Sequence, residues 1–145
     1  MVVTDHGWVR EATASDAHRV FELASQLAMS FRPQRSAFDR SFAVLLADEG
    51  CLPLVAEADG ELAGYLLGFT HPTFFANGPV GWVEELMVAP GARRRGVGRE
   101  LMAAFEEWCA GRGCRLVAAA TRRASGFYTG LGYEESATYL RKLFD

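Results

Sequence analysis

Two apolar runs joined by Asp59-Gly60 are the feature that most constrains the fold. The first run spans 52–58 and the second spans 62–69. Because Asp-Gly tolerates the positive φ angles of a two-residue turn, the pattern predicts a β-hairpin. This hairpin commits the middle of the chain to a β-sheet.

The other elements follow from apolar periodicity and from turn residues. Further strands are predicted at 8–12, 80–88, 116–120 and 138–144. Helices are predicted from 13 to about 30, from Pro33 to about 50, between Gly91 and Gly111, and at 124–131. This order predicts an α/β fold of the mixed α+β kind, with a central mixed, mostly antiparallel sheet and helices on both faces.

Length and composition narrow the function classes. The chain has 145 residues, of which 50% are hydrophobic and 23% are charged, and its formal net charge is -3. These values predict one globular domain over 1–145 and argue against broad adhesion to nucleic acid or an anionic membrane. Three cysteines without a CxxC pair suggest neither a disulfide framework nor a zinc site, and no other metal set emerges. Without a leader or a membrane-length apolar run, we expect a reducing cytoplasm.

A glycine-rich and arginine-rich segment, 93–99, lies between a predicted strand and a predicted helix. Its glycines let a ligand approach the backbone, and the unpaired amides of a helix start bind phosphate. Three arginines in the first helical turn oppose the helix dipole at a cost of ~0.3–1 kcal/mol each, which an anion would offset. The segment is neither a Walker loop nor a complete GxGxxG, since position 101 is leucine. A solvated basic helix start is the alternative interpretation.

Residues 93–98, Arg-Arg-Arg-Gly-Val-Gly, match the signature R/Q-x-x-G-x-G/A. Residues 84–90 resemble the strand that precedes this signature, and 124–133 resemble a second signature with a tyrosine ahead of a Gly-aromatic pair. Both motifs stand in the right order. The chain therefore resembles the GNAT superfamily of acyl-CoA-dependent N-acyltransferases, and the resemblance covers nearly its whole length.

The resemblance implies that acetyl-CoA is the co-substrate. In this family the fourth and fifth strands splay apart, the pantetheine arm lies between them, and the pyrophosphate lies over the amides of the glycine-rich turn. Where the family often has asparagine, this chain has Thr121, whose hydroxyl has a shorter reach and one donor fewer. The implied cofactor contacts are Leu86, Met87, Val88, Arg93, Arg94, Arg95, Gly96, Val97, Gly98, Arg99, Thr121, Ser125 and Tyr128.

Acetylation of an amine needs a proton acceptor, because an amine of pKa ~10.4 is free base in roughly one molecule in 2,000 at pH 7. Glu84 and Glu85 are the candidates, and alternation along a strand allows only one of them into a given cleft. The resemblance favours Glu84. It also places Tyr128 beside the sulfur. We expect a backbone amide of the same strand, that of Val88, to hold the developing oxyanion. A structural ion pair or a solvated edge is the alternative for the glutamates, and ordinary packing is the alternative for Tyr128.

These observations predict an N-acetyltransferase that moves the acetyl group of acetyl-CoA directly to a primary amine of a small molecule or peptide. Its acceptor contacts are expected among Phe31, His71, Phe74 and Phe75. A noncatalytic acyl-CoA-binding sensor and a phosphate-binding protein unrelated to CoA remain alternatives. Neither nucleic acid nor membrane is an expected partner, and a homodimer is compatible with the family.

Overall fold

A single five-stranded sheet organises the computed structural model, which describes residues 8–144. Its strands lie in the order β1-β2-β3-β4-β5; the first four are antiparallel neighbours, and β4 and β5 are parallel. The bounds are β1 Val9–Glu11, β2 Cys51–Ala58, β3 Glu61–His71, β4 Val80–Val88 and β5 Val117–Ala119. The mixed, mostly antiparallel sheet that the sequence predicts is therefore confirmed.

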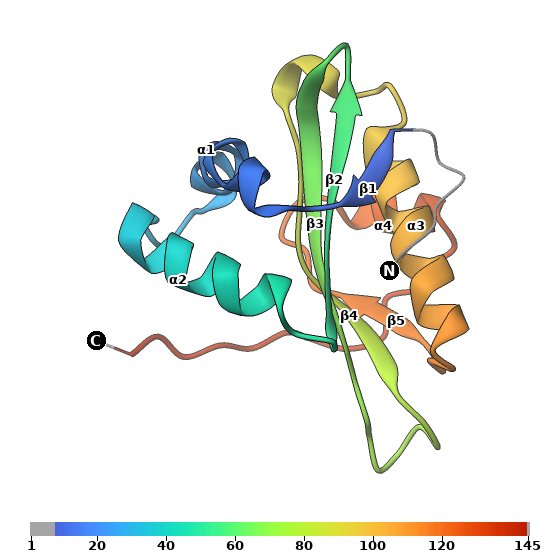
Figure 1. Cartoon of the computed structure of the whole chain (residues 1–145). Helices are drawn as coiled ribbons and strands as arrows, with labels where there is room; N and C mark the ends of the chain where they lie inside the picture. The colour runs from blue at the N-terminus through green and yellow to red at the C-terminus, as the bar shows by residue number, and fades with distance from the viewer. Residues whose placement is uncertain (1–7, 145) are drawn as a thin grey trace.

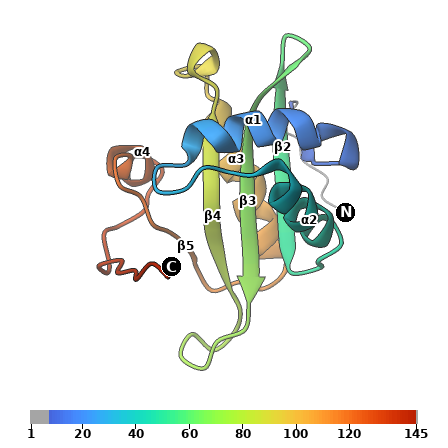
Figure 2. The ribbon, with the colours of Figure 1, turned by 90° about the vertical axis from the view of Figure 1, so that its left-hand side faces the viewer.

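Helices cover both faces of the sheet (Figure 1; Figure 2). On one face lie α1 and α2, and on the other lie α3 and α4. The helical bounds are η1 Ala14–Asp16, α1 Ala17–Leu27, α2 Arg35–Leu46, η2 Pro90–Ala92, α3 Val97–Gly111 and α4 Ser125–Gly130. Among the helices of residues 8–144, none combines the length and the apolar character that a membrane crossing requires.

The hairpin of β2 and β3 forms as predicted. Asp59 and Gly60 both have positive φ, 57° and 80°, which is the combination that a type I′ turn requires. Ala58 pairs with Glu61 directly across this turn. Beyond it, β3 pairs along its length with β2 on one side and with β4 on the other, so β3 is the central strand of the sheet.

Helix α3 packs on the sheet through the ring of Phe105, which is fully buried. This ring lies directly against Gly68 in β3, because a Cβ added at position 68 would overlap its ring carbons. An alanine fits there only if the ring moves. Gly68 therefore sets how closely α3 approaches the sheet, and with it the position of the amino end of α3.

An ion pair fixes the amino end of α1. Arg10 of β1 donates from Nη1 and Nη2 to the two carboxylate oxygens of Asp16, at 2.8 and 2.9 Å. The backbone N–H of Thr13 donates to the same carboxylate at 2.8 Å. These bonds, above all the one from Arg10, hold the pKa of the buried Asp16 below its usual value. The paired charges join the end of β1 to the start of the helix.

The strand predicted at 138–144 does not form, and this prediction is wrong. Residues 133–144 are irregular, and their apolar side chains Tyr139, Leu140, Leu143 and Phe144 are exposed. The segment touches the linker between α1 and α2 through a 2.8 Å bond from Arg141 to Ser30. A strand needs a neighbour that supplies backbone donors and acceptors, and a β-like composition does not provide one. Helices α1 and α2 also end earlier than predicted, at Leu27 and Leu46.

The contact between Gly68 and Phe105 predicts that Gly68→Ala lowers the free energy of unfolding by about 1–3 kcal/mol, because overpacking displaces the ring. Urea denaturation measures this loss. Gly111→Ala is the matched control: it lies at the end of α3, and its added Cβ meets no atom within 4 Å beyond its chain neighbours and its own helix backbone. It should not lower the free energy of unfolding, since alanine is favoured over glycine in a helix by up to ~1 kcal/mol. Equal losses in the two variants would contradict the packing role of Gly68.

Candidate functional site

An opening in the sheet between β4 and β5 is the centre of the candidate site. The two strands pair only from Gly81 to Val83, opposite Val117 to Ala119. From Glu85 onward β4 remains paired with β3, but on its other edge it pairs with no strand of residues 8–144. Its free edge leaves backbone donors and acceptors available to an extended ligand, as the edge of a sheet does.

The glycine-rich turn stands at the far end of this opening, at the start of α3. Arg94 and Gly96 have positive φ, 66° and 84°, and for an arginine this is an uncommon conformation. Within the described residues the N–H groups of 94–99 make no backbone turn or cap bond, whereas that of Glu100 donates to the carbonyl of Gly96. The turn therefore presents a row of free amides at the positive end of a helix, which suits a phosphate group.

The four arginines of this turn differ in their partners. Arg93 donates from Nε to the carbonyl of Val88 at 3.2 Å, so it braces the end of β4. Arg95 forms an exposed ion pair at 3.1 Å with Asp59 of the hairpin turn. Arg94 and Arg99 are exposed and form no ion pair within residues 8–144. These two remain available to an anion at the helix start.

Helix α4 closes the opening from the β5 side. A Cβ on Gly98 would lie 3.2 Å from the Phe127 ring and 3.6 Å from Val88, so Gly98 is the point where α3, α4 and β4 meet. Tyr133 strengthens the contact by donating to Glu106 of α3 at 2.6 Å. The two sequence motifs, far apart along the chain, thus lie against each other.

Tyr128 lies in this contact and is half-buried. Its ring packs edge-on against Phe127 and Tyr133, with centroids 5.1 and 5.6 Å away. Burial raises the pKa of Tyr128 above its ordinary value, so the phenol keeps its proton at neutral pH. Its hydroxyl bonds to no group in the part of the chain described, and is available as a donor to a ligand.

In the structure, the side chain of Thr121 bonds to the backbone of its own loop. Its Oγ1 accepts a 2.9 Å hydrogen bond from the backbone N–H of Ala124, which shapes the turn into α4. Ser125, the first residue of α4, is exposed. Of the strand residues predicted to contact cofactor, Leu86 and Val88 are half-buried, and the Met87 side chain is buried under α1.

A β-bulge in β4 separates the two glutamates. Leu67 pairs with Glu85 and Gly68 pairs with Val83, which leaves Glu84 without a partner on β3. Glu84 is exposed, accepts a 3.2 Å bond from the Trp82 indole, and is the first residue of β4 beyond the last pair with β5. Glu85 is half-buried and accepts a 2.6 Å bond from the Tyr65 hydroxyl.

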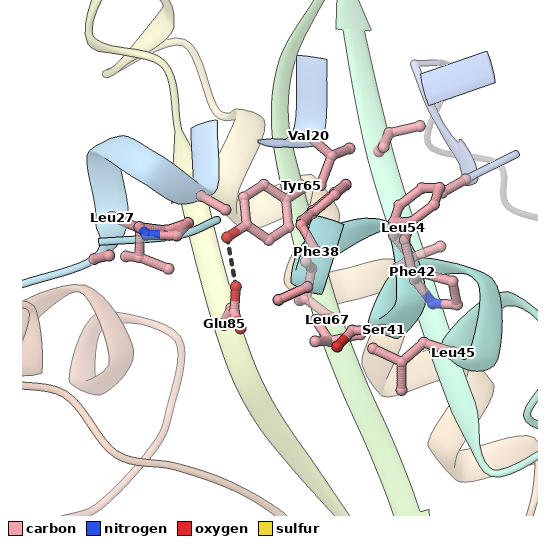
Figure 3. Close-up of a pocket in the computed structure, with 18 of the residues that line it drawn as sticks. Val20, Leu27, Phe38, Ser41, Phe42, Leu45, Leu54, Tyr65, Leu67 and Glu85 are labelled. Atoms are coloured by element: carbon pink, nitrogen blue, oxygen red, sulfur yellow. Dashed lines mark hydrogen bonds between the residues drawn. The ribbon is translucent and has the colours of Figure 1, made fainter. Parts of the chain in front are cut away.

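The two glutamates line different hollows. Glu85 borders a cavity of about 460 Å³ between α1, α2 and the sheet (Figure 3). Phe31 also lines this cavity, together with Phe38, Phe42 and Tyr65, which sequence reasoning assigned no functional role. Glu84 lines a shallower hollow with His71 and Trp82. A β-bulge, rather than the strict alternation of a regular strand, separates the two side chains.

The structure does not bring all the predicted acceptor contacts together. Phe74 and Phe75 lie in the loop between β3 and β4, are exposed, and line neither hollow. His71 stands at the end of β3, with Nδ1 3.1 Å from the Pro72 carbonyl oxygen. Only Phe31 reaches the cavity between the helices and the sheet. Nowhere in residues 8–144 do three or more histidine, cysteine or acidic side chains gather as a metal ion would need.

Known acetyltransferases resemble this chain in sequence and in structure. Aminoglycoside N(6')-acetyltransferase type 1 of Stenotrophomonas maltophilia is 32% identical over 136 residues, which cover 88% of this chain and 86% of that protein. Glucosamine 6-phosphate N-acetyltransferase 1 of Oryza sativa subsp. japonica is 35% identical over 135 residues, with 88% and 81% covered. The solved structure of AAC(6')-Iy with the bisubstrate analog CoA-S-monomethyl-acetylneamine matches with a TM-score of 0.77 and 25% identity, covering 94% of this chain and 97% of that one.

The family assignment rests on most of the chain. The model of the acetyltransferase (GNAT) family matches residues 17–133, from α1 through the second motif. This span contains the glycine-rich turn, the opening between β4 and β5, and Tyr128. The chain belongs to the GNAT family of acetyltransferases.

Proposed function

We propose that this protein is an N-acetyltransferase that moves the acetyl group of acetyl-CoA to a primary amine by direct attack. The observation that carries the proposal is the free edge of β4, which runs from the two glutamates toward the glycine-rich turn and meets α4, the helix of Tyr128, near Val88. The relatives named above support it: two are named as N-acetyltransferases of amino sugars or aminoglycosides, and the third was solved with a CoA conjugate.

The residues present fit acetyl-CoA. The free amides of 94–99, with Arg94 and Arg99, would hold the pyrophosphate, and the open edge of Leu86 to Val88 would pair with the amide groups of the pantetheine arm. Arg93 supports this edge through the Val88 carbonyl. When bound there, acetyl-CoA supplies an activated thioester. The residues of the chain must then accept the proton that the amine loses and stabilise the thiolate that departs.

We assign acceptance of the amine proton to Glu84. It stands where β4 and β5 separate, and its exposed carboxyl reaches solvent, so a water molecule can relay the proton. Glu85, inside the cavity, is better placed to hold the ammonium group of the acceptor before it loses that proton. The donor bond from Tyr65 fixes the Glu85 carboxyl in place.

Tyr128 acts at the other end of the reaction, on the departing sulfur. A thiol has a pKa of ~8.5 and tyrosine one of ~10, so full proton transfer from Tyr128 would be uphill by roughly 2 kcal/mol. Burial, which raises the pKa of Tyr128 further, enlarges this difference. We therefore propose that the phenol stabilises the thiolate through a hydrogen bond without giving up its proton.

We also propose an amine as the partner, the cytoplasm as the location and a homodimer as the assembly. A net charge of -3 supports a small-molecule or peptide amine rather than nucleic acid or membrane as the partner. The three cysteines are free thiols, which supports a reducing cytoplasm for this single-domain chain. The unpaired segment 134–144, with four exposed apolar side chains, is the surface we propose for contact with a second copy in a homodimer.

Binding of acetyl-CoA should stabilise the fold. At 100 times its dissociation constant a ligand adds ~2.7 kcal/mol, which corresponds to about 5–10 °C in Tm for a domain of this size. Differential scanning fluorimetry with acetyl-CoA, CoA and ADP measures the shift. We expect acetyl-CoA and CoA to raise Tm well beyond ADP. An unchanged Tm at millimolar acetyl-CoA would contradict the proposed function.

Tyr128→Phe should lower kcat by about 10²- to 10⁴-fold and leave the Kd of acetyl-CoA within about threefold, because only the hydrogen bond to the thiolate is lost. Steady-state thiol release and calorimetric binding separate the two effects. Tyr139→Phe, in the exposed C-terminal segment, is the matched control and should keep wild-type kcat. Since the raised pKa keeps Tyr128 protonated, wild-type kcat should show no loss from this group until above pH ~10.

Glu84→Gln should lower kcat/KM for an amine by about 10²- to 10³-fold at pH 7, and the deficit should shrink toward pH 10 as free amine becomes abundant. Glu85→Gln should instead raise the KM for the amine by about tenfold, with a smaller change in kcat. Glu61→Gln, exposed at the start of β3, is the control for removing one carboxyl. A pH-independent deficit in Glu84→Gln would remove this residue from proton transfer.

A further inference from the structure

The cavity beside Glu85 has an unusual lining for an acceptor site of this reaction. It lies between the inner sides of α1 and α2 and the face of β3 that presents Tyr65 and Leu67 (Figure 3). Among residues 8–144, Glu85 is the one acidic or basic residue that lines it, and the other polar groups are those of Gln34, Ser41 and the Tyr65 hydroxyl. The other lining residues that the structure describes are apolar, and no lysine, arginine or histidine of residues 8–144 lines the cavity.

The apolar side of helix α2 is incompletely covered where it faces this cavity. The rings of Phe38 and Phe42 stack at 5.2 Å and, with Leu45, face the cavity. Yet no residue of α2 is fully buried, although the helix lies over the sheet. Its apolar side therefore stays partly uncovered in the free protein, and a ligand that fills the cavity would cover it, with the gain that burial of apolar surface brings.

Resting on the proposed function, we propose that the acceptor is a primary amine with an apolar, ring-sized body, an arylalkylamine in the simplest case. Its ring would lie against Phe42 and its ammonium group would meet Glu85. A cavity of roughly 150 Å³ already holds benzene, so one of about 460 Å³ has room for a ring and an alkyl arm. The single carboxylate at one end of an apolar chamber fixes the orientation of such a molecule.

The same lining disfavours the substrates named for the relatives. A sugar phosphate would bring a dianion to a chamber whose charged group is the carboxylate of Glu85 and which has no basic side chain. An aminoglycoside would bring many hydroxyls, and Gln34, Ser41 and Tyr65 can pair with few of them. Each polar group left without a partner weakens binding. We therefore infer that this chain differs from those relatives in acceptor class while sharing their acetyl donor.

An amine panel tests the inference by steady-state thiol release at saturating acetyl-CoA. The probes are 2-phenylethylamine, ethylamine, glucosamine 6-phosphate and kanamycin A. We expect kcat/KM for 2-phenylethylamine to exceed that of each other amine by at least about tenfold. A value for glucosamine 6-phosphate or kanamycin A that equals or exceeds it would overturn the inference and leave the acetyltransferase function intact. No thiol release with any amine, together with no effect of acetyl-CoA on Tm, would instead overturn the proposed function.

Variants of the cavity wall locate the binding site. Phe42→Ala should raise the KM for 2-phenylethylamine by about tenfold, because the apolar wall against the ring is lost, while the Kd of acetyl-CoA stays within about threefold. Phe42→Leu, which keeps an apolar wall, should restore most of the loss and guards against a folding defect. Val44→Ala, on the same helix but 66% exposed and outside the cavity, is the control. An unchanged KM for 2-phenylethylamine in folded Phe42→Ala would overturn the inference.

Discussion

The short pairing of β4 with β5 is the constraint on which the site depends. Three residues of β5 hold the strand in the sheet, and beyond Val83 the edge of β4 is left open. The opening sets where an extended donor molecule can lie, and it places the glycine-rich turn at one end and Glu84 at the other. A longer β5 would satisfy the backbone of β4 within the protein and remove the site.

The second constraint is the tight contact of α3 with the sheet. The contact of Phe105 with Gly68 sets the distance between α3 and the sheet. Gly98 lets the Phe127 ring approach the first turn of α3. Packing, together with the bonds from Arg93 to the Val88 carbonyl and from Tyr133 to Glu106, therefore positions the free amides of 94–99 relative to the end of β4 and to α4. The site needs this rigidity, because small displacements of reacting groups are costly in catalysis.

Features that depend on neighbouring residues were predictable from the sequence, and features that depend on distant partners were not. The Asp59-Gly60 turn and the left-handed Gly96 follow from the φ preferences of single residues. The strand expected at 138–144 failed because a strand requires a partner that composition does not reveal. The bulge at Glu84 has no signature in the sequence either. Phe38 and Phe42 fit an apolar helical stripe, and such a stripe looks the same whether it packs on a core or lines a cavity.

The ion pair between Arg10 and Asp16 has a mechanical consequence for the cavity. It anchors the amino end of α1, and Arg19 adds a 3.3 Å bond to the Leu62 carbonyl in the same half of the helix. The carboxyl end of α1 and the inner side of α2 meet the sheet through apolar side chains, which impose no directional geometry. Directional bonds therefore fix the charged end of the chamber wall, whereas the shape of its other end depends on side-chain packing alone.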